Sequence, residues 1–427
     1  MMEPTWGLLG PEFLPNSRRT RTLGVGAAVR AFNDLAVPGL GGAWFCKQIV
    51  LALLGIEVAN RAGARNIEVA NAIEALACWL AFDSSGWTPD SRLRGQRKLG
   101  GRRKLRERDL SFNVVRRSNF YVSQPMRRAT VQTLPALGLV ESEGSRFNGF
   151  QCTNAGRDLI LAAFKRKLVD HLVSWVRDEG DRVNSPAWND ALFPTKPLTG
   201  PAREILKDRL LRGAASESAD NRRRRQEALQ WVESCRHADT TQTSWTLRPA
   251  AISCEQHWLD LHAGALFFRM RSLALALLDA MEAHMPAHRV LDLDAGLIER
   301  MSVPIDELRQ SARAFLDLQH DNAQANRFCT ECTATDPILI LKSLVTRDGR
   351  VLRLAGSRIL PGPAFVGRAL EGFDEDADPD AAPAANVEEV RWPDGISERI
   401  PNLFLLNADL HGDLDRYLST SINQGGQ

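Results

Sequence analysis

The sequence predicts a mainly helical protein of several domains. Its 427 residues are enough for two to four domains of about 100–200 residues each. Apolar residues recur at helical spacing over 43–62 and over 66–82, and the short connection between these segments favours an antiparallel helical hairpin. A third such segment, 254–285, predicts the longest helix of the chain, ended by Pro286. These three segments indicate a mainly α, multidomain fold.

We expect four regions along the chain. Residues 1–90 hold the helical hairpin, 91–180 a basic loop with a further helix and hairpin, 200–330 a second helical domain, and 331–427 a mixed α/β region. The proline-containing stretch at 178–200 favours a domain boundary.

Shorter elements are expected in the second half of the chain. Helices are predicted over 202–232 and 303–319, and strands over 337–345 and 350–354 flank a turn. The acidic, proline-containing residues 374–385 predict a linker without regular structure.

Composition gives no global field that would attract a polyanion. Hydrophobic residues make up 44% of the chain, charged residues 25%, and the formal net charge is +2, so affinity for nucleic acid would have to come from local patches. The N-terminus lacks the pattern of a secretory signal, so a cytoplasmic location is expected. The apolar run 49–59 is too short to cross a bilayer, and no membrane association is expected.

One stretch concentrates positive charge. Eight basic residues interleaved with glycines lie between 92 and 106: Arg92, Arg94, Arg97, Lys98, Arg102, Arg103, Lys104 and Arg106. Such a segment repels itself and is attracted to polyanions. A solvated loop without a partner is the alternative, but the segment that follows favours nucleic acid.

That next segment predicts a helix and a strand. Ser123 and Gln124 offer a polar cap, Pro125 suits a first helical turn, and apolar residues at helical spacing continue to Gly138, which can end the helix. A short strand is expected over 139–141.

A hairpin and a further helix complete the segment. Turn residues over 143–149 and a cap at Thr153 or Asn154 predict the hairpin and a helix that continues to residue 176. This order, with Gly-Leu-Val at 138–140 and Thr-x-x-Gly-Arg at 153–157, resembles the second half of a winged-helix domain of MarR-like DNA-binding proteins.

The resemblance covers about residues 92–161 and implies binding to double-stranded DNA. It implies that Arg127, Arg128, Thr130 and Gln132 lie on or near the face that enters the major groove, and that Arg146 at the wing tip meets phosphate or the minor groove. Pro135 departs from the pattern, because a proline late in the helix would kink or end it. The alternative is a winged helix that packs or binds protein.

No cofactor is expected, and ordinary thiols are the favoured interpretation of the cysteines, with zinc as the one cofactor that their spacing allows. Cys329 and Cys332 have the spacing at which two thiolates grip one zinc ion, but no second pair stands at the usual distance. Cys254 with His257, or Cys235 with His237, would complete the site if the fold brought them near. A redox pair is the other alternative.

Enzyme signatures are weak. The chain has no phosphate-binding loop, nucleophile elbow or His-Glu-x-x-His motif. Asp409-Leu410-His411-Gly412 imitates a metallophosphoesterase motif by accident. Asp292, Asp294 and Glu299 would suit a diverged metal-dependent nuclease, although capping of a helix start explains them more simply.

The favoured function is therefore a DNA-binding, non-catalytic subunit or regulator, in a bacterial DNA-processing or defence assembly with protein partners or further copies of itself. A protein-interaction scaffold and a diverged nuclease are the alternatives.

Overall fold

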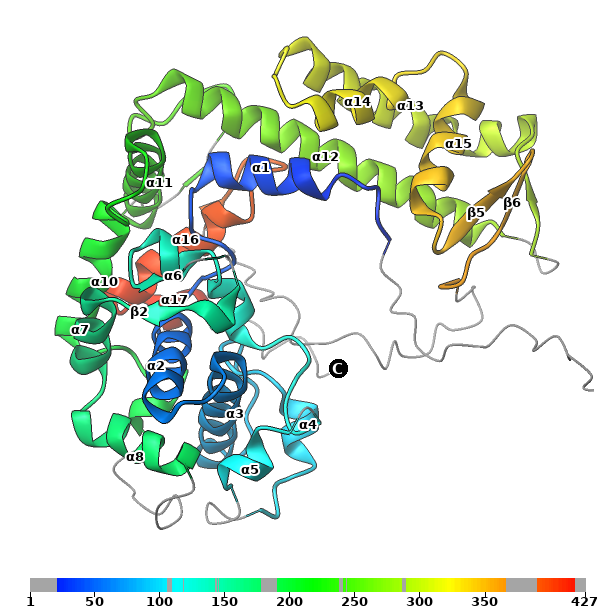
Figure 1. The fold of residues 1–427 in the computed structure, drawn as a ribbon. Coiled ribbons are helices and arrows are strands. Elements are labelled where there is room, and N and C mark those ends of the chain that lie inside the picture. The colour runs from blue at the N-terminus through cyan, green and yellow to red at the C-terminus, as the bar shows by residue number, and fades with distance from the viewer. Residues whose placement is uncertain are drawn as a thin grey trace, which may run out of the picture. The chain divides into compact units, whose positions relative to one another are not determined.

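The computed structural model describes residues 21–105, 110–117, 119–142, 144, 146–177, 190–237, 241–242, 244–285, 289–365 and 390–418. It is mainly helical, which confirms the predicted fold class (Figure 1). The chain divides into two compact units, a first unit of Met1–Val29 with Leu266–Ala377 and a second unit of Arg30–Ala265 with Asp378–Gln427. Their boundaries fall within helices α1 (Gly26–Ala36) and α12 (Glu255–Ala283) and do not coincide with those of the four predicted regions.

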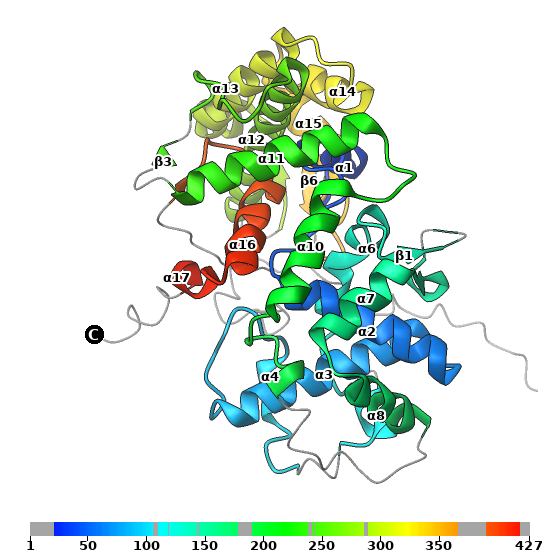
Figure 2. The same ribbon diagram turned by 90° about the vertical axis from the view of Figure 1, so that its left-hand side faces the viewer.

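The second unit holds most of the helices (Figure 2). Besides its parts of α1 and α12, it contains α2 (Cys46–Ala62), α3 (Asn66–Ser84), α4 (Gln96–Gly100), α5 (Phe112–Val115), the 3₁₀ helix η2 (Met126–Thr130), α6 (Thr133–Ala136), β1 (Val140–Glu141), the 3₁₀ helix η3 (Phe147–Gly149), β2 (Gln151–Cys152), α7 (Asn154–Ala163), α8 (Arg166–Arg177), α10 (Gly200–Arg212), α11 (Ala219–His237), β3 (Thr241–Gln242), β7 (Val390–Arg391), α16 (Arg399–His411) and α17 (Leu414–Leu418). β1 and β2 pair antiparallel, and β3 and β7 pair parallel.

The core of the second unit is built around the antiparallel pair α2 and α3, as predicted from their apolar faces. The two helices approach most closely where Gly55 faces Ala70. A Cβ atom on Gly55 would lie 2.5 Å from the Cα atom of Ala70, so a side chain larger than hydrogen does not fit there. Gly63, with φ of +70°, ends α2 in the left-handed conformation that glycine adopts readily.

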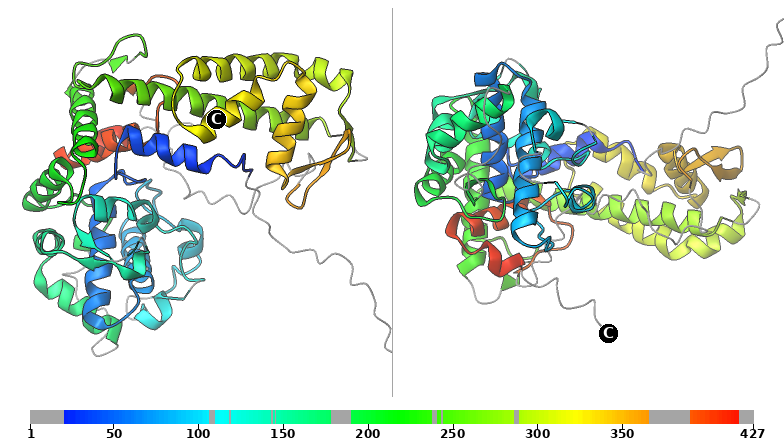
Figure 3. Two further views of the ribbon diagram at one scale, coloured as in Figure 1. Left: turned by 45° about the horizontal axis from the view of Figure 1, so that its top comes forward. Right: turned by 90° about the horizontal axis from the view of Figure 1, so that it is seen from below.

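The first unit is a smaller helical assembly with one antiparallel sheet, drawn in yellow and orange in Figure 3. Besides its parts of α1 and α12, it contains β4 (Leu291–Asp292), α13 (Ala295–Asp317), α14 (Ala323–Cys332), α15 (Pro337–Asp348), β5 (Leu352–Ala355) and β6 (Arg358–Pro361). The strand order is β4-β6-β5, with Leu291 and Leu354 both opposite Ile359.

The predicted strand over 337–345 is wrong, because these residues form helix α15. The Asp336 side chain accepts a hydrogen bond from the Ile338 amide, Pro337 occupies the first turn, and Gly349 ends the helix with φ of +54°. A short apolar run does not by its spacing distinguish a strand from a buried helix, and here the caps decide. The predicted strand over 350–354 is present as β5.

Three predicted helices have other bounds. The helix expected over 202–232 is divided at Gly213 into α10 and α11, and the one expected to continue to 176 is divided at Phe164, whose backbone is extended. The helix expected over 303–319 begins earlier, at Ala295, where Asp294 caps it, so Pro304 lies inside it.

Among the described residues, α12 is the one helix long and apolar enough to cross a membrane. Half of its apolar window is buried inside the protein. It also carries the buried polar side chains of His257, Asp260 and Glu282. A core helix has the same length and composition.

Replacing Gly55 with alanine is expected to destabilise the second unit by about 1–3 kcal/mol, because the added methyl group collides with α3. Urea unfolding followed by tryptophan fluorescence measures this effect, since nine of the ten tryptophans belong to the second unit.

The matched control is Gly200→Ala at the start of α10, where an added Cβ would meet no atom within 4 Å. That variant should stay within about 0.5 kcal/mol of the native protein. Equal effects of the two substitutions would contradict the close crossing of α2 and α3.

Candidate nucleic-acid interface

The predicted basic run forms α4 and the turn after it, and aromatic rings hold two of its arginines. The guanidinium of Arg102 lies 4.8 Å from the ring centroid of Phe120, and that of Arg103 lies 4.8 Å from the ring of Trp87. Trp87 in turn stacks on Phe82 at the end of α3, with ring centroids 5.4 Å apart. A cation over an aromatic face is attracted by the ring quadrupole, so both arginines are positioned while they keep their charge.

Backbone carbonyl groups and a buried leucine fix the same segment. Arg102 Nη2 donates to the carbonyl oxygen of Asn119 at 3.0 Å, and Lys98 Nζ donates to that of Tyr121 at 3.3 Å. Leu99 of α4 is fully buried. The run is therefore a built surface attached to α3 and to residues 119–121.

Several cations of this segment have no acidic partner among the described residues. Arg97, Lys104 and Arg117 are exposed and make no ion pair there, whereas Arg116 pairs with Glu68 at 3.3 Å. Sequence reasoning missed Arg116 and Arg117, which follow α5. Their signal was the Arg-Arg pair itself, a few residues beyond the predicted run. We call the set Arg97, Lys98, Arg102, Arg103, Lys104, Arg116 and Arg117 the basic surface.

Two arginines of the predicted run, Arg92 and Arg94, are not accessible on the basic surface. Arg92 pairs with Asp90 at 2.8 Å and with Asp415 of α17 at 2.7 Å, and its side chain is 13% exposed. Arg94 is buried, at 8% exposure. Their prediction as nucleic-acid contacts is wrong, because Arg92 is neutralised by two carboxylates and Arg94 is buried. Arg106 lies outside the described residues.

The predicted continuous recognition helix up to Gly138 is also wrong. Its residues form the 3₁₀ helix η2, a turn, and the single helical turn α6. The hydroxyl group of Thr130 donates to the Arg127 carbonyl at 2.8 Å, and Pro135 has no amide to donate. Both features work against a regular α-helix.

The buried carboxyl group of Glu74 on α3 anchors the start of η2. Oε1 accepts hydrogen bonds from the Tyr121 hydroxyl at 2.8 Å and the Met126 amide at 2.6 Å, and Oε2 accepts one from the Arg127 amide at 3.1 Å. Burial raises the pKa of Glu74, and these hydrogen bonds lower it in part.

The loop of residues 39–42, which contains three glycines, packs against η2 and α6. The Gly42 amide donates to the Ala129 carbonyl at 3.0 Å, and a Cβ on Gly41 would lie 2.6 Å from that same oxygen. The Thr133 hydroxyl donates to the Leu40 carbonyl. Thr130 is 0% exposed inside this packing, so its predicted place on a groove-facing surface is wrong.

The other predicted base-reading residues differ in accessibility. Arg127 is partly buried over the ring of Phe147, and Gln132 is exposed but accepts a hydrogen bond from Arg399 at 2.7 Å. Arg128 and Arg146 are exposed and make no ion pair within the described part of the chain. Both remain accessible to a phosphate group.

The hairpin after this segment is present where the sequence predicts it. Val140 lies opposite Cys152 and Glu141 opposite Gln151 in an antiparallel pair. Asn66 of α3 holds the connection by donating to a carbonyl oxygen of the intervening residues at 3.0 Å.

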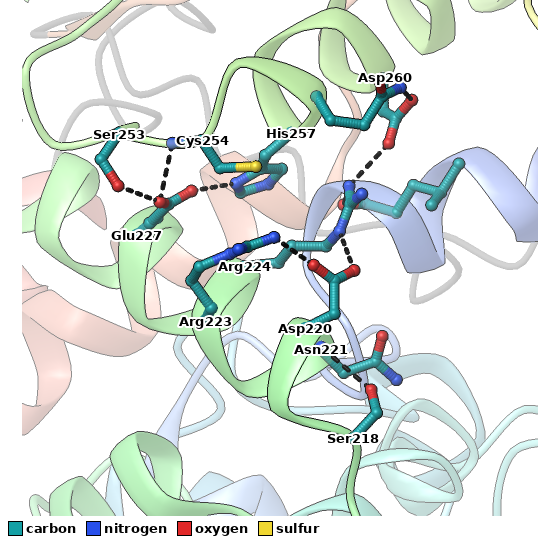
Figure 4. A network of polar contacts seen from close by, with 12 residues as sticks. Ser218, Asp220, Asn221, Arg223, Arg224, Glu227, Ser253, Cys254, His257 and Asp260 are labelled. Atoms are coloured by element: carbon teal, nitrogen blue, oxygen red, sulfur yellow. Dashed lines mark hydrogen bonds and ion pairs between the residues drawn. The ribbon is translucent and has the colours of Figure 1, made fainter.

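Four consecutive arginines at 222–225, near the start of α11, form another basic cluster, and carboxylates neutralise most of it. Arg224 forms ion pairs of 2.8 Å with Asp220 and with Asp260, and Arg225 pairs with Glu217. Figure 4 shows Arg224 between its two carboxylates. Neither Arg224 nor Arg225 is available for contact with a phosphate group.

His257 belongs to the same network. Its Nδ1 lies 2.8 Å from Glu227 Oε2 (Figure 4), and its Nε2 lies 3.0 Å from the carbonyl oxygen of Ala36. Glu227 also accepts hydrogen bonds from the hydroxyl of Ser253 and the amide of Cys254. Both ring nitrogens of His257 are engaged, so neither has a free lone pair for zinc.

The Cys-x-x-Cys pair is buried in the first unit. Burial raises the pKa of Cys329 and of Cys332 to about 12, which favours the thiol over the thiolate that zinc binds. Within the described ranges, no group of three or more His, Cys, Asp or Glu side chains is placed to hold a metal ion.

Carboxylates considered for a nuclease, and Asp409 of the metallophosphoesterase-like motif, have structural partners. Asp292 pairs with Arg358 at 3.2 Å, Asp294 accepts a hydrogen bond from the Leu297 amide at the start of α13, and Asp409 accepts one from the Cys46 amide. The capping interpretation of Asp294 is confirmed.

Comparison with known proteins gives no match: no protein-family model, no curated protein and no solved structure is similar to this chain.

Replacing Glu74 with glutamine is expected to destabilise the second unit by about 1–3 kcal/mol at pH 4, because an amide nitrogen cannot accept from the Arg127 amide. The raised pKa of Glu74 means that the folded protein keeps a proton that the unfolded chain loses near pH 4.3. Retention of this proton favours the folded state at low pH, and the stability gained in this way is lost as the pH rises through the folded-state pKa of Glu74. The difference between native protein and variant should therefore shrink with rising pH in urea unfolding.

Glu68→Gln, on the same helix but part-exposed, is the control and should destabilise the second unit by less than about 1 kcal/mol, the scale of an exposed ion pair. A difference between native protein and Glu74→Gln that stays constant or grows with pH would contradict the assignment.

Proposed function

We propose that this protein binds double-stranded DNA through the basic surface, as a non-catalytic component. One observation carries the proposal: aromatic rings and backbone carbonyl oxygens fix Lys98, Arg102 and Arg103, and the exposed Arg97, Lys104 and Arg117 of the same surface have no acidic partner among the described residues. Phosphate groups are the ligands that such an arrangement suits, since each contact releases condensed counterions.

Arginines elsewhere in the chain provide a comparison, because several of them are paired with carboxylates. Arg21 donates to Asp279, Glu282 and Asp348, and its side chain is 7% exposed. Arg347 pairs with Glu331 at 2.7 Å. The 46 arginines are thus largely offset by acids, in line with a net charge of +2, and the basic surface departs from that pattern.

The contacts expected are with phosphate more than with bases. A single helical turn such as α6 presents too few side chains to read a major groove in the manner of a recognition helix. Arg128 and Arg146, which the winged-helix resemblance implicates, are accessible for additional phosphate contacts. We therefore expect strong salt dependence and weak sequence preference.

The proposal is tested by fluorescence anisotropy with a labelled DNA duplex of about 30 base pairs between 50 and 200 mM salt. Reversing two exposed cations, Arg97→Glu with Lys104→Glu, should weaken binding at least tenfold at 50 mM salt. The slope of log affinity against log salt should become shallower by about 2, which corresponds to two lost phosphate contacts. Arg102 and Arg103 are less suitable, because their replacement also removes packing against aromatic rings.

The matched control reverses two exposed arginines of α13 in the first unit, Arg300→Glu with Arg313→Glu, and alters the net charge equally. This control should bind as the native protein does. Absence of duplex binding at 50 mM salt, or equal losses in the two double variants, would contradict the proposal. Nuclease-resistant association with a protein partner in that case would favour the scaffold function.

A further inference from the structure

The second unit contains a cavity of about 1210 Å³ bordered by residues 131–132, α6 and the β1–β2 hairpin and by residues of α10 and α11. Such a volume accommodates an organic ligand of the usual size. Two hydrogen bonds join its walls: the Ala214 amide donates to the Ala136 carbonyl at 2.8 Å, and Arg209 Nε donates to the Leu137 carbonyl at 2.7 Å. The cavity is therefore held open by the fold.

Arg222, in the first turn of α11, lines this cavity and is partly buried. Its Nε atom is buried, and no acceptor among the described residues lies within hydrogen-bond distance. Its neighbours Arg224 and Arg225 have carboxylate partners. A buried donor without an acceptor is rare in proteins and requires an explanation, and a bound anion supplies one.

The charges around the cavity favour an anion. Arg209 donates to two backbone carbonyl oxygens, those of Leu137 and Gly213, which orient its guanidinium without neutralising it. Burial, together with the nearby Arg212 and Arg225, lowers the pKa of Arg209, although Asp208 opposes this effect.

The other charged residues of the lining change this balance little. Asp34 is paired with Arg399 at 2.5 Å, and Arg212 with Asp208 at 2.7 Å. Glu141 is an exposed carboxylate at the lining. The lining thus presents Arg209 and Arg222 against the exposed Glu141 and the half-exposed Asp34, which is paired with Arg399.

Two further parts of the lining suit a phosphorylated organic molecule. The residues 214–216 lead into α11, and the N-terminus of a helix carries a partial positive charge that attracts phosphate. Val131, Pro135 and Val140 supply an apolar surface for the rest of the ligand.

We propose that this cavity binds a phosphorylated small molecule of nucleotide size. Its phosphate group lies against Arg209 and Arg222, and its uncharged part lies against Val131 and Val140. This site is separate from the basic surface and does not rest on the proposed binding of DNA.

Isothermal titration calorimetry of the full chain tests the proposal with three probes: adenosine monophosphate, inorganic pyrophosphate and uncharged adenosine. The two phosphates should bind with a stoichiometry of one, and adenosine at least tenfold more weakly than its monophosphate. Arg222→Gln should weaken binding of adenosine monophosphate by at least tenfold, which is the scale of one charged hydrogen-bonding group. The neighbouring Arg223→Gln, whose exposed side chain pairs with Asp220, is the control and should bind as the native protein does.

A second variant, Val131→Phe, fills the cavity from a half-buried position without changing charge and should weaken binding as well. The Arg97→Glu, Lys104→Glu double variant should bind the phosphates normally, which separates this site from the basic surface. No phosphate binding by the native chain, unchanged binding by Arg222→Gln, or loss of binding in that double variant would overturn the proposal.

Discussion

The buried carboxyl group of Glu74 is the interaction on which the candidate interface depends. It joins α3 to the Tyr121 hydroxyl and to the amides of Met126 and Arg127. The carbonyl oxygen of Tyr121 in turn accepts a hydrogen bond from the ammonium group of Lys98, and the Tyr121 ring lies next to Gly95 at the start of α4. One side chain therefore positions both the basic surface and the start of η2. Its desolvation costs free energy, which three hydrogen bonds offset in part.

Arginines of similar sequence context have very different roles in this chain. Arg92 pairs with Asp415 of α17 and Arg94 is buried, whereas Arg97, a few residues further on, is exposed. Arg224 and Arg225 are neutralised inside the second unit, whereas Arg222 of the same run lines a cavity. The net charge does not distinguish the neutralised or buried arginines from the exposed and cavity-lining ones. The two proposed sites therefore rest on where carboxylates are absent among the described residues as much as on where arginines are present.

Helices whose formation depends on local apolar periodicity were predicted correctly from the sequence. The prediction was wrong where contacts with residues distant in sequence determine the backbone conformation. The helices expected over 43–62 and 66–82 are present because their apolar faces pair with each other. The continuous helix expected up to Gly138 is absent because Glu74 and the loop at Gly41 hold its residues in another conformation. No spacing within the segment reveals either partner. The basic run was identifiable from composition, but which of its members face solvent depends on packing against α3 and α17.

The central claim, that the basic surface is where duplex DNA lies, is tested most directly by lysine footprinting with mass spectrometry. The chain has eight lysines, and two exposed ones, Lys98 and Lys104, belong to the basic surface, while the exposed Lys165 and Lys196 lie outside it. Added duplex should protect Lys98 and Lys104 from acylation and leave Lys165 and Lys196 reactive. Equal reactivity of all four lysines with and without DNA, or protection confined to Lys165 and Lys196, would contradict the account.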